Sequence, residues 1–253
     1  MAGGAVRASR NGGPYGRLSR SPDAGAPPQQ EAALPDAAVH GRVRRPAMER
    51  RLAALKKSLN GSALAFAEAY LRRSTDVMAA IRPGELAQVI ELLSAARSDQ
   101  RRVFICGNGG SATTASHFTA GLCKEGSWEQ PEKFRALALT DNIAWITSLA
   151  NDTDFSRVFV EQLRNHAEAD DVLIVFSGSG NSRNVLRAVE WANERGLVTV
   201  GITGRSGGAL GKLVRHRVTV DSDHMGHVEE GHFLIQHLIT YYFMEAHPDG
   251  GER

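Results

Sequence analysis

Two segments rich in serine and glycine each follow a short apolar run that has the length of a buried strand. Residues 103–106 (VFIC) lead into 107–111 (GNGGS), and residues 172–176 (VLIVF) lead into 177–182 (SGSGNS). Glycines let backbone N–H groups approach an anion, serines add hydroxyl donors, and the N-terminus of a following helix adds its positive dipole end. If the two strands are neighbours in one sheet, both segments face one crevice, which predicts a site for a phosphorylated ligand.

Two other interpretations of these segments stay open at this point. Gly107, Gly109 and Ala112 match the G-x-G-x-x-A pattern of dinucleotide-binding turns. In that pattern the ribose-binding acid follows after about 20 residues, whereas Asp141, which ends the next predicted strand, lies further on. Glycine, serine and asparagine also suit ordinary tight turns, which would explain either segment alone better than the pair. A Walker A pattern is absent from the sequence, and we expect no nucleotide cofactor.

Histidine is the second residue type that could take part in catalysis or metal binding. The chain has nine histidines, among them His117 on the helix predicted after the first segment and His237 in the last predicted helix. Glu229 precedes His237 by eight residues, which is about 12 Å along a straight helix and too far for easy shared ligation. If both serve one site, either the helix begins later than predicted or the site lies between subunits. Each histidine could equally be a hydrogen-bonded core residue.

Composition and charge fit a globular protein with one sizeable domain. The chain has 253 residues, of which 42% are hydrophobic and 23% charged, and a formal net charge of +2. Arginines crowd into the first 50 residues, so the net charge gives little support for a nucleic-acid partner. Two cysteines and no apolar run of the ~18 residues that span a bilayer lead us to expect a cytoplasmic protein without a membrane segment.

The chain divides into a tail, a domain and a short end segment. Residues 1–46 are rich in glycine, proline, alanine and arginine, which predicts a disordered N-terminal extension. Residues 47–247 are predicted to form a single domain that includes N-terminal helices, and residues 248–253 a C-terminal tail. Apolar residues recur at helical spacing over 48–73, with a possible break at Asn60-Gly61. Another helix is predicted after Pro83.

From residue 103 onward, predicted strands alternate with predicted helices. The strands are 103–106, 136–139, 172–176, 198–202 and 217–220, and the helices are about 111–124, 142–150, 155–167, 182–195, 207–213 and 228–245. This alternation predicts an α/β fold, a three-layer α-β-α sandwich with a five-stranded parallel sheet. In such sheets ligands bind outside the carboxyl ends of the strands, where both serine-rich segments lie.

Taken together, these motifs resemble the sugar isomerase (SIS) domain, and more narrowly the bacterial phosphoheptose isomerases. The resemblance covers about residues 50–245 and rests on 106–111 (CGNGGS), His117-Phe118, Asn151-Asp152, 177–182 (SGSGNS) and His237. It implies a flavodoxin-like sheet, a helix packed between subunits, and a homotetramer with sites shared by neighbouring chains. It also implies an aldose–ketose isomerase of a phosphorylated sugar, with sedoheptulose 7-phosphate as the expected substrate.

The resemblance also implies roles for particular residues. The phosphate is expected to bind Ser111, Ser177, Ser179 and Ser182, with Asn108, Gly109 and Asp141 near the sugar. His237 is expected to shuttle a proton. Several of these isomerases bind zinc, and the matching set of possible ligands here is His117, Glu229 and His237.

Two positions depart from the pattern of the phosphoheptose isomerases. Their catalytic glutamate, four residues after His117, is Gly121 here, and their glutamine is Glu229. Because aldose–ketose conversion requires a base to move a proton between C1 and C2, we hypothesise that Glu229 supplies the carboxylate beside His237. The alternative is a phosphosugar-binding or regulatory protein without catalysis. The DnaA initiator-associating protein, a relative of these isomerases that lacks the same glutamate, is of that type.

Overall fold

The computed structural model describes residues 62–245, and every structural statement below concerns this part of the chain. The expected N-terminal extension (1–46) and C-terminal tail (248–253) lie outside the described residues, as does the first half of the helix expected over 48–73. Within 62–245 no helix combines the length and the apolar character that crossing a membrane requires.

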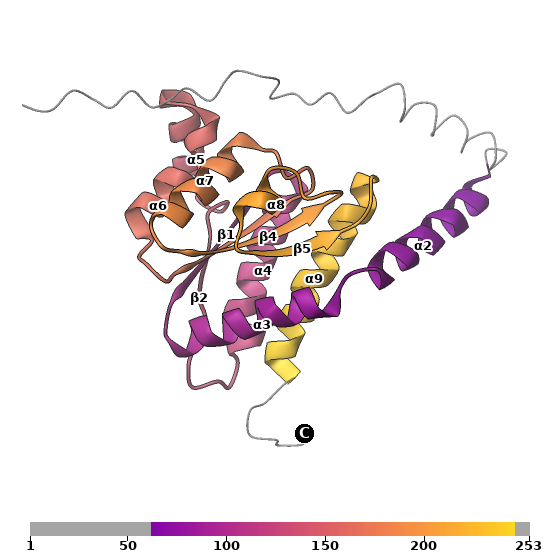
Figure 1. The fold of residues 1–253 in the computed structure, drawn as a ribbon, viewed down its shortest axis with the longest axis horizontal. Helices are drawn as coiled ribbons and strands as arrows, with labels where there is room; N and C mark the ends of the chain where they lie inside the picture. The colour runs from indigo at the N-terminus through magenta and orange to yellow at the C-terminus, as the bar shows by residue number, and fades with distance from the viewer. Residues whose placement is uncertain (1–61, 246–253) are drawn as a thin grey trace, which may run out of the picture. The chain divides into compact units, whose positions relative to one another are not determined.

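Five parallel strands form one sheet, as the sequence predicted, and their order in it is β2-β1-β3-β4-β5 (Figure 1). They are β1 (Arg102–Gly107), β2 (Arg135–Ala138), β3 (Val172–Ser177), β4 (Val198–Gly204) and β5 (His216–Val220). The central strand β3 is buried along its whole length, which explains its continuous apolar sequence. Because β1 pairs directly with β3, the two serine-rich segments leave the sheet next to each other, where the strand order reverses.

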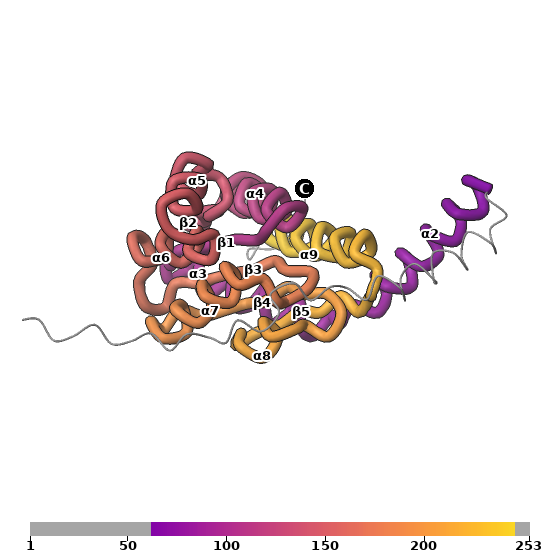
Figure 2. The backbone as a smooth tube through the Cα atoms, turned by 90° about the horizontal axis from the view of Figure 1, so that it is seen from above, coloured from indigo at the N-terminus to yellow at the C-terminus, as the bar shows by residue number. Residues whose placement is uncertain are grey.

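Helices cover both faces of this sheet. They are α2 (Ala63–Ala79), α3 (Pro83–Ser98), α4 (Gly110–Cys123), α5 (Ile143–Asp152), α6 (Val160–His166), α7 (Arg183–Glu194), α8 (Leu210–Leu213) and α9 (Met225–Glu245). One apolar cluster joins the sheet to α3, α4 and α9, and a second joins it to α6, α7 and α8. Figure 2 shows α4 and α9 side by side on one side of the strands and α7 and α8 on the other. The predicted three-layer architecture is confirmed.

Successive residues of β1 supply both halves of the core. Phe104 belongs to the cluster beneath α6 and α7, whereas Ile105 belongs to the cluster beneath α3, α4 and α9, because side chains alternate along a strand. Both side chains are fully buried. Burial of each contributes roughly 1.5–3 kcal/mol, so the sheet holds the two helical layers in fixed positions around the site.

The predicted helix over 155–167 is wrong at its N-terminal end. Phe155–Arg157 forms a 3-10 turn, and α6 begins only at Val160. The side chain of Asp154 accepts a hydrogen bond of 2.7 Å from the N–H of Ser156, which closes a tight turn before the helix. This side-chain bond competes locally with regular helical geometry.

Candidate functional site

The two serine-rich segments each lead into a helix whose N-cap residue makes no side-chain hydrogen bond to it. Helix α4 follows Gly109 and α7 follows Ser182, and among the described residues neither N-cap position makes a side-chain hydrogen bond to its helix. Uncapped N-termini leave backbone N–H groups and a partial positive charge facing outward. Asn108 and Asn184 join the two segments through amide hydrogen bonds of 2.9 and 2.8 Å. We call the space between the two segments the anion crevice.

The serines of the two segments differ in their exposure. Ser111 and Ser177 are buried, Ser182 is half-buried and Ser179 is exposed. The oxygen of Ser177 accepts a hydrogen bond of 3.1 Å from the N–H of Gly180, and the oxygen of Ser179 accepts one of 3.3 Å from Asn181. These bonds fix the oxygens and leave the hydroxyl hydrogens able to donate to a ligand.

Glycine is required in the first segment for steric reasons. A Cβ on Gly107 would lie 2.7 Å from the Cβ of Ser111 and 2.9 Å from the carbonyl oxygen of Phe176, so only glycine fits between the two strand ends. Gly109 has φ of +57°, a left-handed conformation that side chains disfavour. The local sequence therefore turns the chain sharply into α4 and presents the helix N-terminus to the crevice.

Asn108 and Asp141, the two predicted sugar-binding side chains, already make hydrogen bonds within the protein. The amide of Asn108 is occupied by Asn184, so its structural role is to couple the two segments. Asp141 follows β2 and accepts hydrogen bonds from Ser116 and from Thr140. Asn184 was not among the predicted site residues. Its position in the first turn of α7, two residues after Ser182, could have identified it.

His117 and His237 form a close pair between α4 and α9. Their Nε2 atoms lie 3.3 Å apart, and the ring planes meet at 81°. The ring of Phe233 packs edge-on against both imidazoles. Burial, and then the neighbouring His117, lower the pKa of His237 below its usual value. The lowered pKa favours the neutral imidazole, whose lone pair can accept a proton or bind a metal.

Glu229 lies at a different place along the same helix. Its carboxylate would be 3.2 Å from a Cβ placed on Gly110, so it sits at the N-terminal end of α4, beside the anion crevice. Helix α9 begins at Met225, earlier than the predicted residue 228, and Glu229 and His237 share one continuous helix. They are about 12 Å apart along its axis. Within one chain the structure does not bring these two residues together, and a site between subunits is the remaining possibility.

The distance between Glu229 and His237 also limits which residues could hold a zinc ion together. Within residues 62–245 no group of three or more histidine, cysteine or acidic side chains is arranged to hold a metal. Two imidazole nitrogens on one tetrahedral zinc lie about 3.3 Å apart, for Zn–N bonds of about 2.05 Å. The His117–His237 pair matches that separation. The pair thus fits two of four zinc positions, and the described part of one chain, Glu229 included, supplies no third.

Gly121, where the phosphoheptose isomerases have a glutamate, is buried against α9. A Cβ at this position would lie 2.7 Å from Oγ1 and 3.0 Å from Cγ2 of Thr240. The missing Cβ allows α4 and α9 to approach closely along this turn. A longer side chain at residue 121 therefore requires a shift of one helix or of Thr240.

The neighbouring carboxylate, Glu230, is committed to a structural contact. The hydroxyl of Tyr70 donates to it at 2.5 Å and that of Ser74 at 2.7 Å. Partial burial acts to raise the pKa of Glu230, but these hydrogen bonds and His227 hold it below its usual value. The bond to Glu230 also raises the pKa of Tyr70 to about 12. Glu230 thus connects α2 to α9, which leaves Glu229 as the acidic side chain of α9 beside the crevice.

Comparisons with known proteins agree with this arrangement. The SIS domain family matches residues 66–204. A phosphoheptose isomerase of Azoarcus sp. is 38% identical over 157 residues, which are 61% of this chain and 79% of that protein. A phosphoheptose isomerase of Francisella tularensis superposes with a TM-score of 0.68 at 32% identity, covering 73% of this chain and all of that structure. The corresponding structure from Neisseria gonorrhoeae gives 0.64 at 30% identity, over 79% of this chain. The chain belongs to the SIS domain family, and within it to the phosphoheptose isomerase group.

Proposed function

We propose that this protein is an aldose–ketose isomerase of a phosphorylated sugar, with sedoheptulose 7-phosphate as its substrate. The two serine-rich segments carry the proposal, because they leave the paired strands β1 and β3 side by side and each opens a helix whose N-cap makes no side-chain hydrogen bond. Such a site suits a phosphate dianion. The relatives that the chain matches are named phosphoheptose isomerases, which supports a seven-carbon sugar phosphate.

Binding of the phosphate would place the reacting carbons. With the phosphate held by Ser111, Ser177, Ser179 and Ser182, the C1–C2 end of the sugar is confined to a small volume, and positioning of this kind can supply several kcal/mol of the barrier reduction. Conversion of ketose to aldose needs a base that removes a proton from one carbon and returns it to the other. The neutral His237 and the carboxylate of Glu229 are the groups we assign to these proton transfers.

Since these two groups are about 12 Å apart on one helix, we propose that a complete site combines two chains. The outer face of α9 exposes a row of large apolar side chains, which are Phe233, Leu234, Leu238, Tyr241 and Tyr242. Helix α2 buries none of its own residues and exposes Leu64, Phe66 and Leu71. Apolar surfaces of this kind are typical of protein interfaces. They support a homo-oligomer, which we propose to be a tetramer.

A divalent metal is the third part of the proposal. His117 and His237 would hold it, with the remaining ligands coming from a second chain, water or the sugar itself. When bound, zinc would polarise the sugar carbonyl and stabilise the charge that develops on its oxygen. The two histidines would then serve as ligands in that state, and Glu229 would be the proton-transferring group.

The decisive test measures turnover of sedoheptulose 7-phosphate by the purified full chain, with and without added zinc. We expect conversion to the aldose, and Glu229→Gln should reduce kcat by at least a hundredfold with little change in KM, since loss of a general base typically costs about 10²–10⁴ in rate. Glu91→Gln on the exposed face of α3 is the matched control and should be fully active. Normal binding of the sugar without any turnover in the wild type would overturn the isomerase proposal.

The close contact between Gly121 and Thr240 favours one alternative. Because Thr240 occupies the space of the expected glutamate, a protein that binds sugar phosphates without isomerising them is the second candidate. Its partner would be a replication initiator, as for the DnaA initiator-associating protein. Recovery of an initiator protein in a pull-down with the full chain, together with sugar-phosphate binding and no turnover, would support this alternative.

A further inference from the structure

A polar cavity lies beside β4 and the edge strand β5, away from the serine-rich segments. It has a volume of about 330 Å³ and is lined by Ala80, Arg82, Arg205, Ser206, Arg217, Thr219 and Asp221. These residues come from the connection between α2 and α3, from the segment after β4, and from β5 and its end. None of them belongs to the serine-rich segments. The volume is in the range of small-molecule sites.

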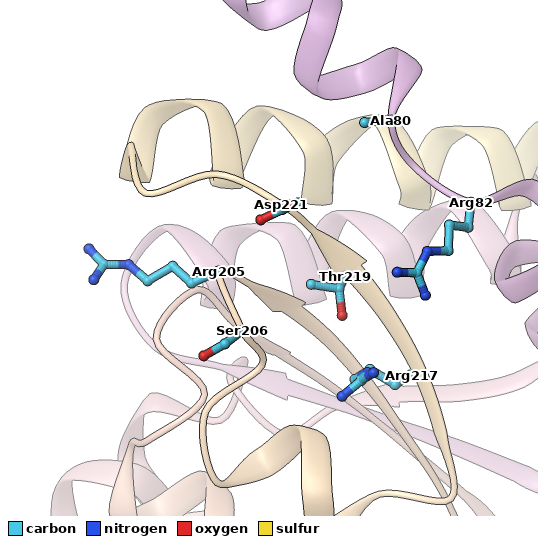
Figure 3. Close-up of a pocket in the computed structure, with 7 residues that line it drawn as sticks. All are labelled: Ala80, Arg82, Arg205, Ser206, Arg217, Thr219 and Asp221. Carbon is cyan, nitrogen blue, oxygen red and sulfur yellow. The ribbon is translucent and has the colours of Figure 1, made fainter.

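One end of this cavity is basic. Figure 3 shows the guanidinium groups of Arg82 and Arg217 on two sides of the hydroxyl of Thr219. Arg82 is paired with Glu85 at 2.9 Å and remains 74% exposed, so its charge is only partly compensated. Arg217 forms no ion pair with any residue in 62–245, and its guanidinium donates a 3.5 Å hydrogen bond to the carbonyl of Gly211. Two guanidinium groups and a hydroxyl are a suitable donor set for a phosphate.

The opposite end of the cavity is a mixture of hydroxyl and carboxylate groups. Arg205, Ser206 and Asp221 also line an adjoining cavity of about 510 Å³, which Ser222 and Asp223 complete. Figure 3 shows Arg205, Ser206 and Asp221 together, away from Arg82 and Arg217. Carboxylates repel a phosphate but accept hydrogen bonds from hydroxyl groups. This end is therefore suited to the hydroxyls of a sugar or polyol.

The backbone at Arg205 is held in a conformation that ordinary residues avoid. Arg205 has φ of +55°, and its Nε atom is buried without a hydrogen-bond partner among the described residues. In Figure 3 the Arg205 side chain extends away from Arg82 and Arg217, so Arg205 adds no donor to the basic end of the cavity.

We propose that this cavity binds a phosphorylated polyol or sugar, with the phosphate between Arg82 and Arg217 and the hydroxyls toward Asp221. The site is separate from the anion crevice but connected to it through the segment after β4. The N–H of Leu210 donates to the carbonyl of Gly180 at 2.9 Å, and that of Ala209 donates to the side chain of Asn181 at 3.0 Å. A ligand in the cavity therefore contacts the segment that supports the phosphate-binding serines.

Sorbitol 6-phosphate is a suitable probe because it has the phosphate and the hydroxyls but no carbonyl to isomerise. Its binding to the full chain is measured by calorimetry in a Ser111→Ala/Ser179→Ala background, which weakens the anion crevice. We expect one remaining site per chain, at least tenfold weaker binding after Arg217→Met or Arg82→Met, and no binding of sorbitol. Arg215→Met removes the same charge from an exposed arginine outside the cavity and should leave binding unchanged.

The outcomes separate the parts of the proposal. Unchanged binding in both Arg217→Met and Arg82→Met would overturn the site, and so would an equal loss in Arg215→Met. If inorganic phosphate binds as tightly as sorbitol 6-phosphate, the hydroxyl groups contribute nothing to the affinity. That result would overturn the proposal that the ligand is a polyol or sugar. All of these measurements are made without turnover, so they stand apart from the test of isomerase activity.

Discussion

The Nε2 atom of His117 lies 3.3 Å from that of His237, so that α4 and α9 present their imidazoles to one point. If both Nε2 atoms carry a proton, neither can accept a hydrogen bond from the other. Burial and the neighbouring His117 lower the pKa of His237, which favours its neutral form. This geometry is well suited to a shared metal ion and gives the first prediction.

His237→Asn should reduce zinc affinity by at least tenfold, because one of the two imidazole ligands is lost. The measurement is a competition titration of zinc with a chromophoric chelator, using the full chain. His216→Asn, on the edge strand β5, is the matched control and should bind zinc as the wild type does. Equal zinc affinity in wild type and His237→Asn would remove the pair from any metal site.

Ser182→Ala should weaken binding of the sugar phosphate by about tenfold or more, the value expected for a lost hydrogen bond to a charged group. The unfolding free energy should stay constant, since the Ser182 side chain makes no capping hydrogen bond to α7. Calorimetric titration and urea unfolding measure the two quantities. Ser148→Ala on the exposed face of α5 should change neither affinity nor turnover. Loss of stability with unchanged affinity would contradict this role.

Gly121→Ala should destabilise the protein, although alanine is the better helix former by about 1 kcal/mol. The new Cβ would meet Thr240 at 2.7 Å, and overpacking of this kind costs about 1–3 kcal/mol. In a Thr240→Ala background the clash is relieved and the same substitution should be neutral or stabilising, which a double-mutant cycle of unfolding free energies measures. Gly84→Ala is the control, because nothing lies within 4 Å of its Cβ. Additive effects at residues 121 and 240 would refute the steric explanation.

His232 should make stability depend on pH. Burial lowers its pKa from 6.5 to about 4, so between these values the unfolded chain binds more protons than the folded one. The unfolding free energy therefore falls as the pH decreases from 6.5 to 4, by about 3 kcal/mol in total for this group. Urea unfolding at a series of pH values should show a smaller slope in His232→Leu than in wild type, whereas His216→Leu should keep the wild-type slope. Identical slopes in all three proteins would exclude His232 as the source.

Much of the fold follows from local patterns in the sequence. The apolar run 172–176 predicted a strand, and the structure extends it by one residue to Ser177 and places it at the centre of the sheet. Alternation of strands and helices was sufficient for the parallel sheet, because a right-handed crossover is required between parallel neighbours. Helix ends were less predictable. The Asp154 turn and the early start of α9 depend on side-chain bonds and on packing that periodicity does not encode.

The sequence by itself determined which groups could hold a phosphate, since glycine, serine and a following helix are local features of 107–111 and 177–182. Tertiary structure alone decided which of them cooperate. It coupled Asn108 to Asn184 and His117 to His237, pairs that are far apart in the chain. It also kept Glu229 two helical turns from His237, because an unbroken helix from Met225 fixes their spacing at 1.5 Å per residue.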